Sequence, residues 1–279
     1  MDLEHVLYDV RDGVATVTLN EPERLNPISH GPRSMQREIV ECLVAGDDDP
    51  AVRCNVVTGA GRAFSAGGTM SDGLPGGEAV LGWHDLLEVD ARDNARIFEL
   101  RKPVIGAING LCYGAALIMA LHFDLLVARE DARFGLIETR FGGSGVEMLP
   151  FWVGPQWAKF LALTGEIVDA RKAKEIGLVV EVVASDEFAE RIADLARRVA
   201  AMPNDAVVLN RRVINGWLKL HGWAAQAHYA PAVNAITSAV SVTAEMGDGR
   251  RPLELLRSEG WEAFKDARDA PFREPWLRG

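Results

Sequence analysis

Two glycine-rich stretches lie about fifty residues apart in this chain: residues 59–70 read GAGRAFSAGGTM, and residues 109–116 read NGLCYGAA. Each follows a short run of apolar and β-branched residues, 54–58 and 104–108, which is typical of a buried strand. Small residues in the turn that follows let the backbone approach a ligand closely, because no Cβ stands in the way. The pair predicts two backbone N–H groups directed at one oxygen atom, which is the arrangement of an oxyanion hole.

An apolar run, residues 115–123, follows the second glycine-rich stretch. Its length suits a buried helix that begins at Ala115. The backbone N–H of Ala115 would then be free of the helix ladder and would lie at the positive end of the helix dipole. The sequence therefore predicts that one of the two donors belongs to Ala115.

The segments before these turns predict strands and helices in alternation. Residues 6–10 and 14–19 alternate around Arg11-Asp12-Gly13, which indicates a hairpin. Apolar residues four positions apart predict an amphipathic helix over residues 32–45. The glycine-rich residues 73–82 lack periodicity and predict a mobile loop, whereas residues 92–100 predict a helix.

Beyond residue 184 the pattern becomes helical. We expect Ser185 to cap a helix whose apolar stripe consists of Phe188, Ile192, Leu195 and Val199. After residue 203 the strand signals stop, so an α/β core is followed by a helical region. The aromatic residues of that region are expected either at an interface between subunits or in a local core; they are Trp217, Trp223, Tyr229, Trp261 and Trp276.

Composition excludes several classes of protein. The chain has 279 residues, 48% of them hydrophobic, which is enough for a full core in one or two domains. A net charge of −10 argues against a nucleic-acid partner. No apolar run could span a bilayer, and residues 1–10 lack the pattern of a secretion signal, so a cytoplasmic protein without a membrane partner is expected. The three isolated cysteines indicate reduced core thiols.

Competing motifs fail at specific positions. The run that begins at Gly59 starts like GxGxxG but has Phe64 where the dinucleotide fingerprint needs its third glycine. No GxxxxGK[ST] occurs, and residues 142–146 (GGSGV) fall one glycine short of a GxSxG elbow. The six histidines lack metal-ligand spacing. His122 lies one helical turn after Ile118, so it could face the site or be a buried structural histidine.

Five segments in order resemble the crotonase family, also called the enoyl-CoA hydratase/isomerase superfamily. They are TLNEPERLNPIS (residues 18–29), VVTGAGRAFSAGG (56–68), RKPVIGAINGLCYGAA (101–116), DLLVAREDARFGLIE (124–138) and the LTGE to GLVVEVV stretch (163–183). The resemblance covers residues 6–183. It implies a spiral of ββα turns over residues 1–203. It also implies a C-terminal helical oligomerisation region, 204–279, that packs in a homotrimer or in a hexamer formed as a dimer of trimers.

The resemblance also implies the site. The backbone N–H groups of Gly68 and Ala115 would hold the thioester carbonyl of an acyl-CoA, and Glu138 would be the acid/base. Coenzyme A would enter as part of the substrate, with no separate cofactor and no metal. The residues implied to contact the substrate are Arg24, Leu25, Pro27, Arg62, Ala66, Gly67, Met70, Tyr113, Gly114, Ile118 and Gly142. Arg24 and Arg62 are alternatively ordinary solvated arginines.

Three departures from the family pattern bear on the reaction. Ile118 stands where two-glutamate hydratases carry their second carboxylate, Thr69 stands where aspartate is usual, and residues 142–149 (GGSGVEML) lack the usual PGxGG. Glu147 in that loop either replaces the missing acid or is a solvated loop residue. A buried Glu138 beside Leu136 and Ile137 would have a raised pKa, which suits a proton shuttle.

Three hypotheses for the function follow. The first is a single-glutamate enzyme, either an isomerase or an atypical hydratase or lyase. The second is a catalytically degenerate acyl-CoA binding protein, and the third is a hydrolase on the same scaffold. Glu138 argues against the second, and the absence of a nucleophile weakens the third.

Overall fold

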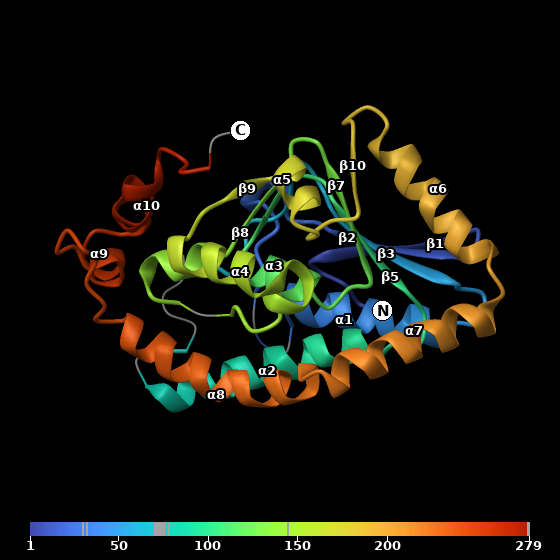
Figure 1. The fold of residues 1–279 in the computed structure, drawn as a ribbon, viewed down its shortest axis with the longest axis horizontal. Helices are drawn as coiled ribbons and strands as arrows, with labels where there is room; N and C mark the ends of the chain where they lie inside the picture. Colours follow the sequence, from blue (N-terminus) through green and yellow to red (C-terminus); the bar gives the residue numbers. More distant parts are fainter. Residues whose placement is uncertain (30, 32, 70–75, 78, 144, 278–279) are drawn as a thin grey trace.

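Six strands form the main sheet of the computed structural model, which describes residues 1–29, 31, 33–69, 76–77, 79–143 and 145–277 (Figure 1). Their order across the sheet is β1-β2-β3-β5-β7-β10, and only β1 runs antiparallel to its neighbour. The strands are β1 (Val6–Arg11), β2 (Val14–Leu19), β3 (Cys54–Gly59), β5 (Val104–Ile108), β7 (Leu125–Arg129) and β10 (Glu181–Val183). The predicted hairpin and both predicted buried strands are confirmed.

A second sheet of four short strands collects the ends of successive turns of the chain. Its order is β4 (Ala63–Ser65), β6 (Leu111–Tyr113), β8 (Arg133–Gly135) and β9 (Val168–Asp169). The β4, β6 and β8 strands are parallel, so their carboxyl ends meet at one edge of the sheet. The segments that leave this edge are residues 66–69, 114–115 and 136–138. This topology brings the two glycine-rich turns and Glu138 together.

Helices connect the strands and cover the sheets. They are α1 (Met35–Asp48), α2 (Val80–Glu99), α3 (Ala115–Ala120), α4 (Leu149–Thr164) and α5 (Ala170–Glu175), with the 3₁₀ turns η1 (Pro22–Arg24) and η2 (Ile137–Phe141). Each unit of two strands and a helix repeats the ββα turn expected from the sequence. In the part of the chain that the structure describes, no helix is both long and apolar enough to cross a bilayer.

The C-terminal region is helical, as expected. It consists of α6 (Phe188–Ala201), α7 (Asn204–Leu220), α8 (Trp223–Ser241), α9 (Pro252–Ser258), α10 (Trp261–Asp269) and the 3₁₀ turn η3 (Ala270–Phe272). Helix α8 runs beside α2 (Figure 1), and Trp223 stacks on Phe98 with ring centroids 3.7 Å apart. Trp223 is buried in this core, whereas Trp217, Tyr229 and Trp276 are exposed.

Several expected boundaries differ in the structure. Helix α1 begins three residues later than predicted, because the Ser34 side chain caps it by accepting from the N–H of Arg37 at 3.2 Å. Ser185 does not cap α6, since the helix begins at Phe188 and its N-cap residue is Glu187. The expected loop over residues 73–82 lies partly outside the described residues, and its last residues belong to α2. The predicted helix over residues 115–123 ends at Ala120.

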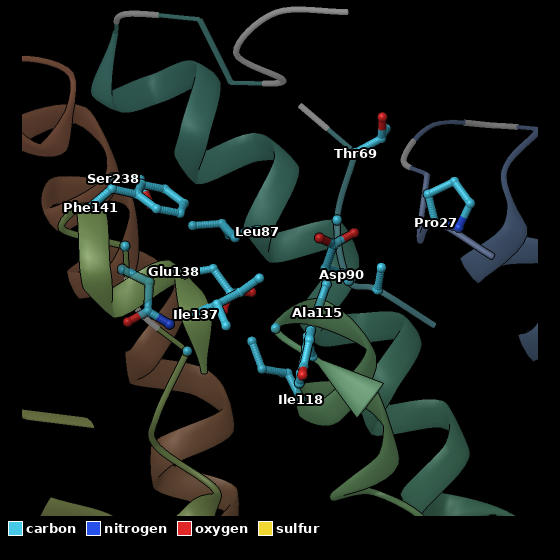
Figure 2. A pocket seen from close by; sticks show the side chains of 18 of the residues that line it. Pro27, Thr69, Leu87, Asp90, Ala115, Ile118, Ile137, Glu138, Phe141 and Ser238 are labelled. Carbon is cyan, nitrogen blue, oxygen red and sulfur yellow. The ribbon is translucent and has the colours of Figure 1, made fainter. Parts of the chain in front are cut away.

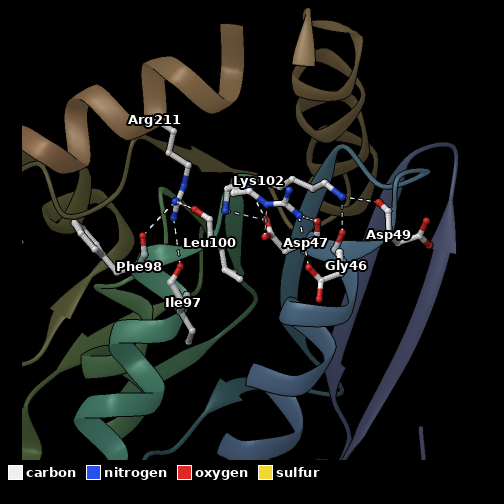
Figure 3. A network of polar contacts seen from close by, with 10 residues as sticks. Gly46, Asp47, Asp49, Ile97, Phe98, Leu100, Lys102 and Arg211 are labelled. Carbon is white, nitrogen blue, oxygen red and sulfur yellow. Dashed lines mark hydrogen bonds and ion pairs between the residues drawn. The ribbon is translucent and has the colours of Figure 1, made fainter. Parts of the chain in front are cut away.

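A buried polar network holds the carboxyl ends of α1 and α2 (Figure 3). The guanidinium of Arg211 on α7 donates to the carbonyls of Ile97, Phe98 and Leu100, and pairs with Asp124 at 2.8 Å. At the end of α1, the Lys102 ammonium donates to the Gly46 carbonyl at 2.9 Å. Cations at helix carboxyl ends satisfy free carbonyls and complement the helix dipole. The network thereby fixes α2, which forms one wall of the cavity described next.

Candidate active site

A cavity of about 590 Å³ lies at the edge where β4, β6 and β8 end. Its wall combines the two glycine-rich turns, η2 and side chains from α2, α8 and α10. Of the residues proposed from the sequence, those that line it are Arg24, Leu25, Pro27, Ala66, Gly67, Gly68, Tyr113, Gly114, Ala115, Ile118 and Glu138. Figure 2 shows Pro27 at one side, Phe141 and Ser238 at the other, and Ala115, Ile118 and Glu138 between them.

The structure does not bring every proposed residue into this wall. Arg62 is exposed and lies away from the cavity. Gly142 ends η2 with a φ of +90° and packs against Ser241 instead, while Gly143 and Gly145 line the cavity in its place. Met70 lies outside the described residues. Arg24 lines the cavity but is exposed and pairs with Glu21 at 3.2 Å.

The turn over residues 66–69 leaves one backbone donor open. The N–H groups of Ala66, Gly67 and Thr69 donate to the Leu25 carbonyl at 2.9 Å, the Ser65 hydroxyl at 3.1 Å and the Ile28 carbonyl at 3.3 Å. The N–H of Gly68 has no such partner among the described residues. Because the neighbouring donors are all used, the turn is held rigidly while the Gly68 N–H stays available to a ligand.

The second turn requires a glycine for a steric reason. Gly114 has a φ of +52°, and its N–H donates to the Gly135 carbonyl at 2.9 Å. A Cβ at this position would lie only 1.9 Å from Oε1 of Glu138. Since Ala115 begins α3, its N–H is outside the helix ladder and lies at the cavity wall. The predicted donor position at Ala115 is therefore built from a turn that only glycine fits.

Glu138 is the second residue of η2, three positions after the end of strand β8. Its Oε2 atom is buried and has no hydrogen-bond partner within the described part of the chain. Burial raises the pKa of Glu138 from 4.5 to about 7, although its own backbone N–H, Arg268 and the backbone N–H of Ala115 each favour the ionised form. A carboxyl with this pKa can both accept and return a proton near neutral pH.

Ile118, at the position where two-glutamate hydratases carry their second carboxylate, is an apolar part of the cavity wall. Ile118 lies one turn along α3 from Ala115, and its side chain lines the cavity (Figure 2). His122, one turn further, is buried outside the cavity wall. Its Nδ1 hydrogen bonds the Ile118 carbonyl at 2.9 Å, and burial lowers its pKa to about 4. Of the two interpretations of His122, the structure supports a buried structural histidine rather than a residue that faces the site.

The walls contributed by α2, α8 and α10 contain residues that the sequence did not single out. On α2 they include Leu87, Asp90 and Asn94, whose Oδ1 is buried without a partner among the described residues. Asn234 of α8 donates to Glu147 at 3.2 Å, and both line the cavity. Helix α10 adds the charged residues Lys265, Arg268 and Asp269. No local motif marks these residues, because their place depends on how distant helices pack.

Comparison with known proteins agrees with this geometry. The family model described as enoyl-CoA hydratase/isomerase matches residues 9–274. The chain belongs to this family. It is 35% identical over 223 residues to 1,2-epoxyphenylacetyl-CoA isomerase of Escherichia coli K12, and this similarity covers 76% of this chain and 82% of that protein. It is 31% identical to a probable enoyl-CoA hydratase of Rhizobium meliloti, over 79% of this chain and 84% of the relative.

A solved structure extends the similarity to the whole fold. An enoyl-CoA hydratase/isomerase from Xanthobacter autotrophicus Py2 superposes with a TM-score of 0.87 at 34% identity, covering 98% of this chain and all of that one. The crotonase fold expected from the five sequence segments is thus confirmed. The chain is a crotonase-type enzyme of the enoyl-CoA hydratase/isomerase family.

Proposed function

We propose that the cavity binds an acyl-CoA thioester with its carbonyl oxygen between the N–H groups of Gly68 and Ala115. Two positioned donors stabilise the negative charge that develops on this oxygen when a proton leaves the neighbouring carbon. Glu138 takes that proton. The observation that carries the proposal is a buried carboxyl, with a pKa of about 7, in one cavity with the unpartnered N–H of Gly68 and with the N–H of Ala115, which hydrogen bonds that carboxyl.

A single carboxylate suits migration of a double bond. Glu138 removes a proton from one carbon to give the enolate and returns it to another carbon, so no water needs to be activated. Ile118 supports this reaction because an isoleucine at the cavity wall neither holds water nor carries a proton. We therefore favour an enoyl-CoA isomerase, and we note that the Escherichia coli relative is named as an isomerase.

One observation favours a second candidate, an atypical hydratase. Glu147 lines the same cavity and accepts a hydrogen bond from Asn234 at 3.2 Å. A carboxylate held in this way could orient a water molecule for addition to the double bond while Glu138 handles the proton. The Rhizobium meliloti relative is named as a probable hydratase.

A matched pair of variants separates the two reactions. A panel of acyl-CoAs is scored by absorbance and mass for isomerisation, hydration and hydrolysis, with wild type, Glu138→Gln and Glu147→Gln. Glu138→Gln removes most activity in either case, because the amide cannot accept a proton. Glu147→Gln leaves an isomerase nearly unchanged and disables a hydratase. Full activity of Glu138→Gln would show that the base lies elsewhere, and release of free acid alone would indicate a hydrolase.

The donor turn is tested separately. Gly68→Pro removes one N–H and is expected to lower turnover by roughly a hundredfold or more, the usual effect of losing one oxyanion donor. Circular dichroism checks that the fold is retained. Binding is expected to be tighter for acyl-CoA than for the free acid, and equal affinities by calorimetry would contradict the assignment of the cavity to a CoA thioester.

We also propose that residues 204–279 include the surface through which the chain forms a homotrimer or a dimer of trimers. Helices α7 and α8 expose a series of large apolar side chains, which are Leu209, Val213, Ile214, Trp217, Leu220, Tyr229, Val233, Ile236 and Val240. Apolar surface of this extent is typical of subunit interfaces. Light scattering at several protein concentrations measures the state, and a monomer at all of them would refute this proposal.

A further inference from the structure

Helix α10 places a buried guanidinium in the wall of the cavity. Arg268 lines the same cavity as Glu138, and its side chain is only 11% exposed. Its Nε and Nη2 donate to the two carboxylate oxygens of Asp269 at 2.8 and 2.7 Å. A bidentate pair of this kind fixes the plane and direction of the guanidinium. The guanidinium of Arg268 is therefore held in one orientation.

The same carboxylate ties α10 to the turn that carries Glu138. Asp269 also accepts from Nη1 of Arg140 at 3.0 Å, and Arg140 belongs to η2, two residues after Glu138. The Arg140 side chain is 6% exposed. Phe141, the last residue of η2, packs edge-on against Phe264 of α10 with centroids 5.3 Å apart. A polar and an apolar contact thus set the distance between α10 and the proposed base.

The network of Arg140, Arg268 and Asp269 carries one net positive charge. Two guanidiniums, Arg140 and Arg268, share the single carboxylate of Asp269. Although burial opposes it, hydrogen bonds and charge from the two arginines hold the pKa of Asp269 below its ordinary value, so Asp269 is ionised. The excess positive charge faces a cavity in which Oε2 of Glu138 is buried without a partner among the described residues.

Other charged and titratable groups line the same cavity as Glu138. From the part of the chain that the structure describes they are Arg24 on η1, Tyr113 on β6, Asp90 on α2, Glu147 before α4, and Lys265 and Asp269 on α10. Arg268 is the charged side chain that lowers the pKa of Glu138, against the larger opposing effect of burial. A buried cation acts strongly because little water screens it.

We propose that Arg268, oriented by Asp269, is a positioning residue that stabilises the carboxylate form of Glu138 and so keeps the base competent at neutral pH. The inference rests on the proposed role of Glu138. It makes the C-terminal helix part of the catalytic unit, because α10 supplies the charged side chain that favours the ionised form of Glu138. Burial alone would hold Glu138 protonated to a higher pH.

The test compares three variants by their pH–rate profiles. Arg268→Met removes the charge, Arg268→Lys keeps the charge, and Arg273→Met is the control. Arg273 lies just beyond α10, pairs with Asp266 on the surface and does not line the cavity. In Arg268→Met the rising limb of kcat/KM is expected to move to higher pH by about one unit, the lower end of what one nearby opposite charge contributes. At about one pH unit below the midpoint of the wild-type limb, kcat/KM of Arg268→Met is then roughly tenfold lower than that of wild type, and the difference disappears at alkaline pH. Arg268→Lys restores the wild-type limb, and Arg273→Met leaves it in place.

A second measurement does not depend on turnover. Carbon-13 NMR of glutamate-labelled protein follows the Glu138 carboxyl, assigned by its absence in Glu138→Gln, through a pH titration. Its midpoint is expected to rise in Arg268→Met and to stay in place in Arg273→Met. If Arg268→Met does not fold, Arg268→Gln, which keeps a donor to Asp269 without the charge, replaces it.

The outcomes separate this inference from the proposed function. The inference is overturned if Arg268→Met changes neither the NMR midpoint of Glu138 nor the rising limb of the pH profile of kcat/KM. It is also overturned if Arg268→Met raises KM without moving that limb, which would indicate that Arg268 contacts the substrate. A moved midpoint in a protein whose Glu138→Gln variant is fully active would instead support the electrostatic coupling and reject Glu138 as the base.

Discussion

Glu138→Gln is expected to stabilise the folded protein at neutral and mildly alkaline pH while it removes activity. Burial raises the pKa of this carboxyl from 4.5 to about 7, and each unit of pKa corresponds to about 1.4 kcal/mol between the two protonation states. The ionised form therefore costs the folded state about 3 kcal/mol. A neutral amide of nearly the same shape carries no such cost.

The sign of the pH dependence follows from proton linkage. Between pH 4.5 and about 7 the folded protein keeps a proton on Glu138 that the unfolded chain has lost. The unfolding free energy of wild type therefore falls as pH rises through this range, by about 1.4 kcal/mol per unit. Glutamine does not titrate, so the advantage of Glu138→Gln is absent below pH 4.5 and complete above about 7.

Urea unfolding of the ligand-free proteins, followed by tryptophan fluorescence at about pH 5 and pH 8, measures this difference. Glu181→Gln is the control, because the hydrogen bond from Lys174 lowers the pKa of that partly exposed carboxyl and its loss cannot produce the same gain. A Glu138→Gln protein no more stable than wild type at pH 8, or a gain that does not grow between the two pH values, would refute the reasoning.

Four further outcomes are expected. Arg211→Met should lower the unfolding free energy by up to about 3–5 kcal/mol in the same assay, because it removes the charge partner of the Asp124 carboxylate, which is 19% exposed, whereas the exposed neighbour Arg212→Met should not. Gly114→Ala should reduce turnover at least a hundredfold, since its Cβ would collide with Glu138; activity near wild type would place the carboxyl elsewhere. Ile118→Glu should gain hydration of a short trans-2-enoyl-CoA and lose a few kcal/mol of stability, because it buries a carboxylate; no gain would mean that this position does not face the substrate. A thiol reagent at about pH 8 should modify no cysteine in the folded protein and all three after unfolding, because burial raises the pKa of each thiol: Cys42, Cys54 and Cys112.

The sequence predicted those parts of the fold that short-range patterns determine. The hairpin, β3 and β5 are read from alternation and from β-branched runs, and the loop after β4 is read from its glycines. The two glycine-rich turns predicted a pair of convergent donors, one of them Ala115, but the assignment of Gly68 and Glu138 came from the resemblance, because spacing along one chain does not show that three strand ends share an edge. The pairing of β4, β6 and β8 supplies that reason.

The glycines of residues 73–82 show where a local interpretation fails. Gly82 lies inside α2, where a Cβ would be 2.3 Å from the Gly76 carbonyl, and a Cβ on Gly76 would be 2.3 Å from the Trp83 ring. These two glycines therefore permit close packing at the start of α2. Composition alone does not distinguish a glycine that allows motion from one that allows contact.

Individual cavity residues of α2, α8 and α10 could not be named from the sequence for a related reason. A helical period tells which side chains share a face, but it does not tell which distant element that face meets. Asn234 and Arg268 look like ordinary polar residues in the sequence, and they acquire a role only because α8 packs along α2 and α10 contacts η2. The one sequence signal for their participation was the missing carboxylate at Ile118, which implied that the surroundings of Glu138 had changed.

The absence of that second carboxylate constrains the chemistry of the remaining one. With an apolar Ile118 at the wall, the charge of an ionised Glu138 must be balanced by backbone N–H groups and by a cation, and the cavity offers both in the Ala115 N–H and Arg268. A base balanced in this way has a pKa close to neutral pH. At that pH it loses a proton about as readily as it gains one. That symmetry is what a proton shuttle between two carbons needs, whereas addition of water also requires a group that holds the nucleophile. The proposed isomerase activity and the proposed role of α10 thus rest on the same arrangement of charge.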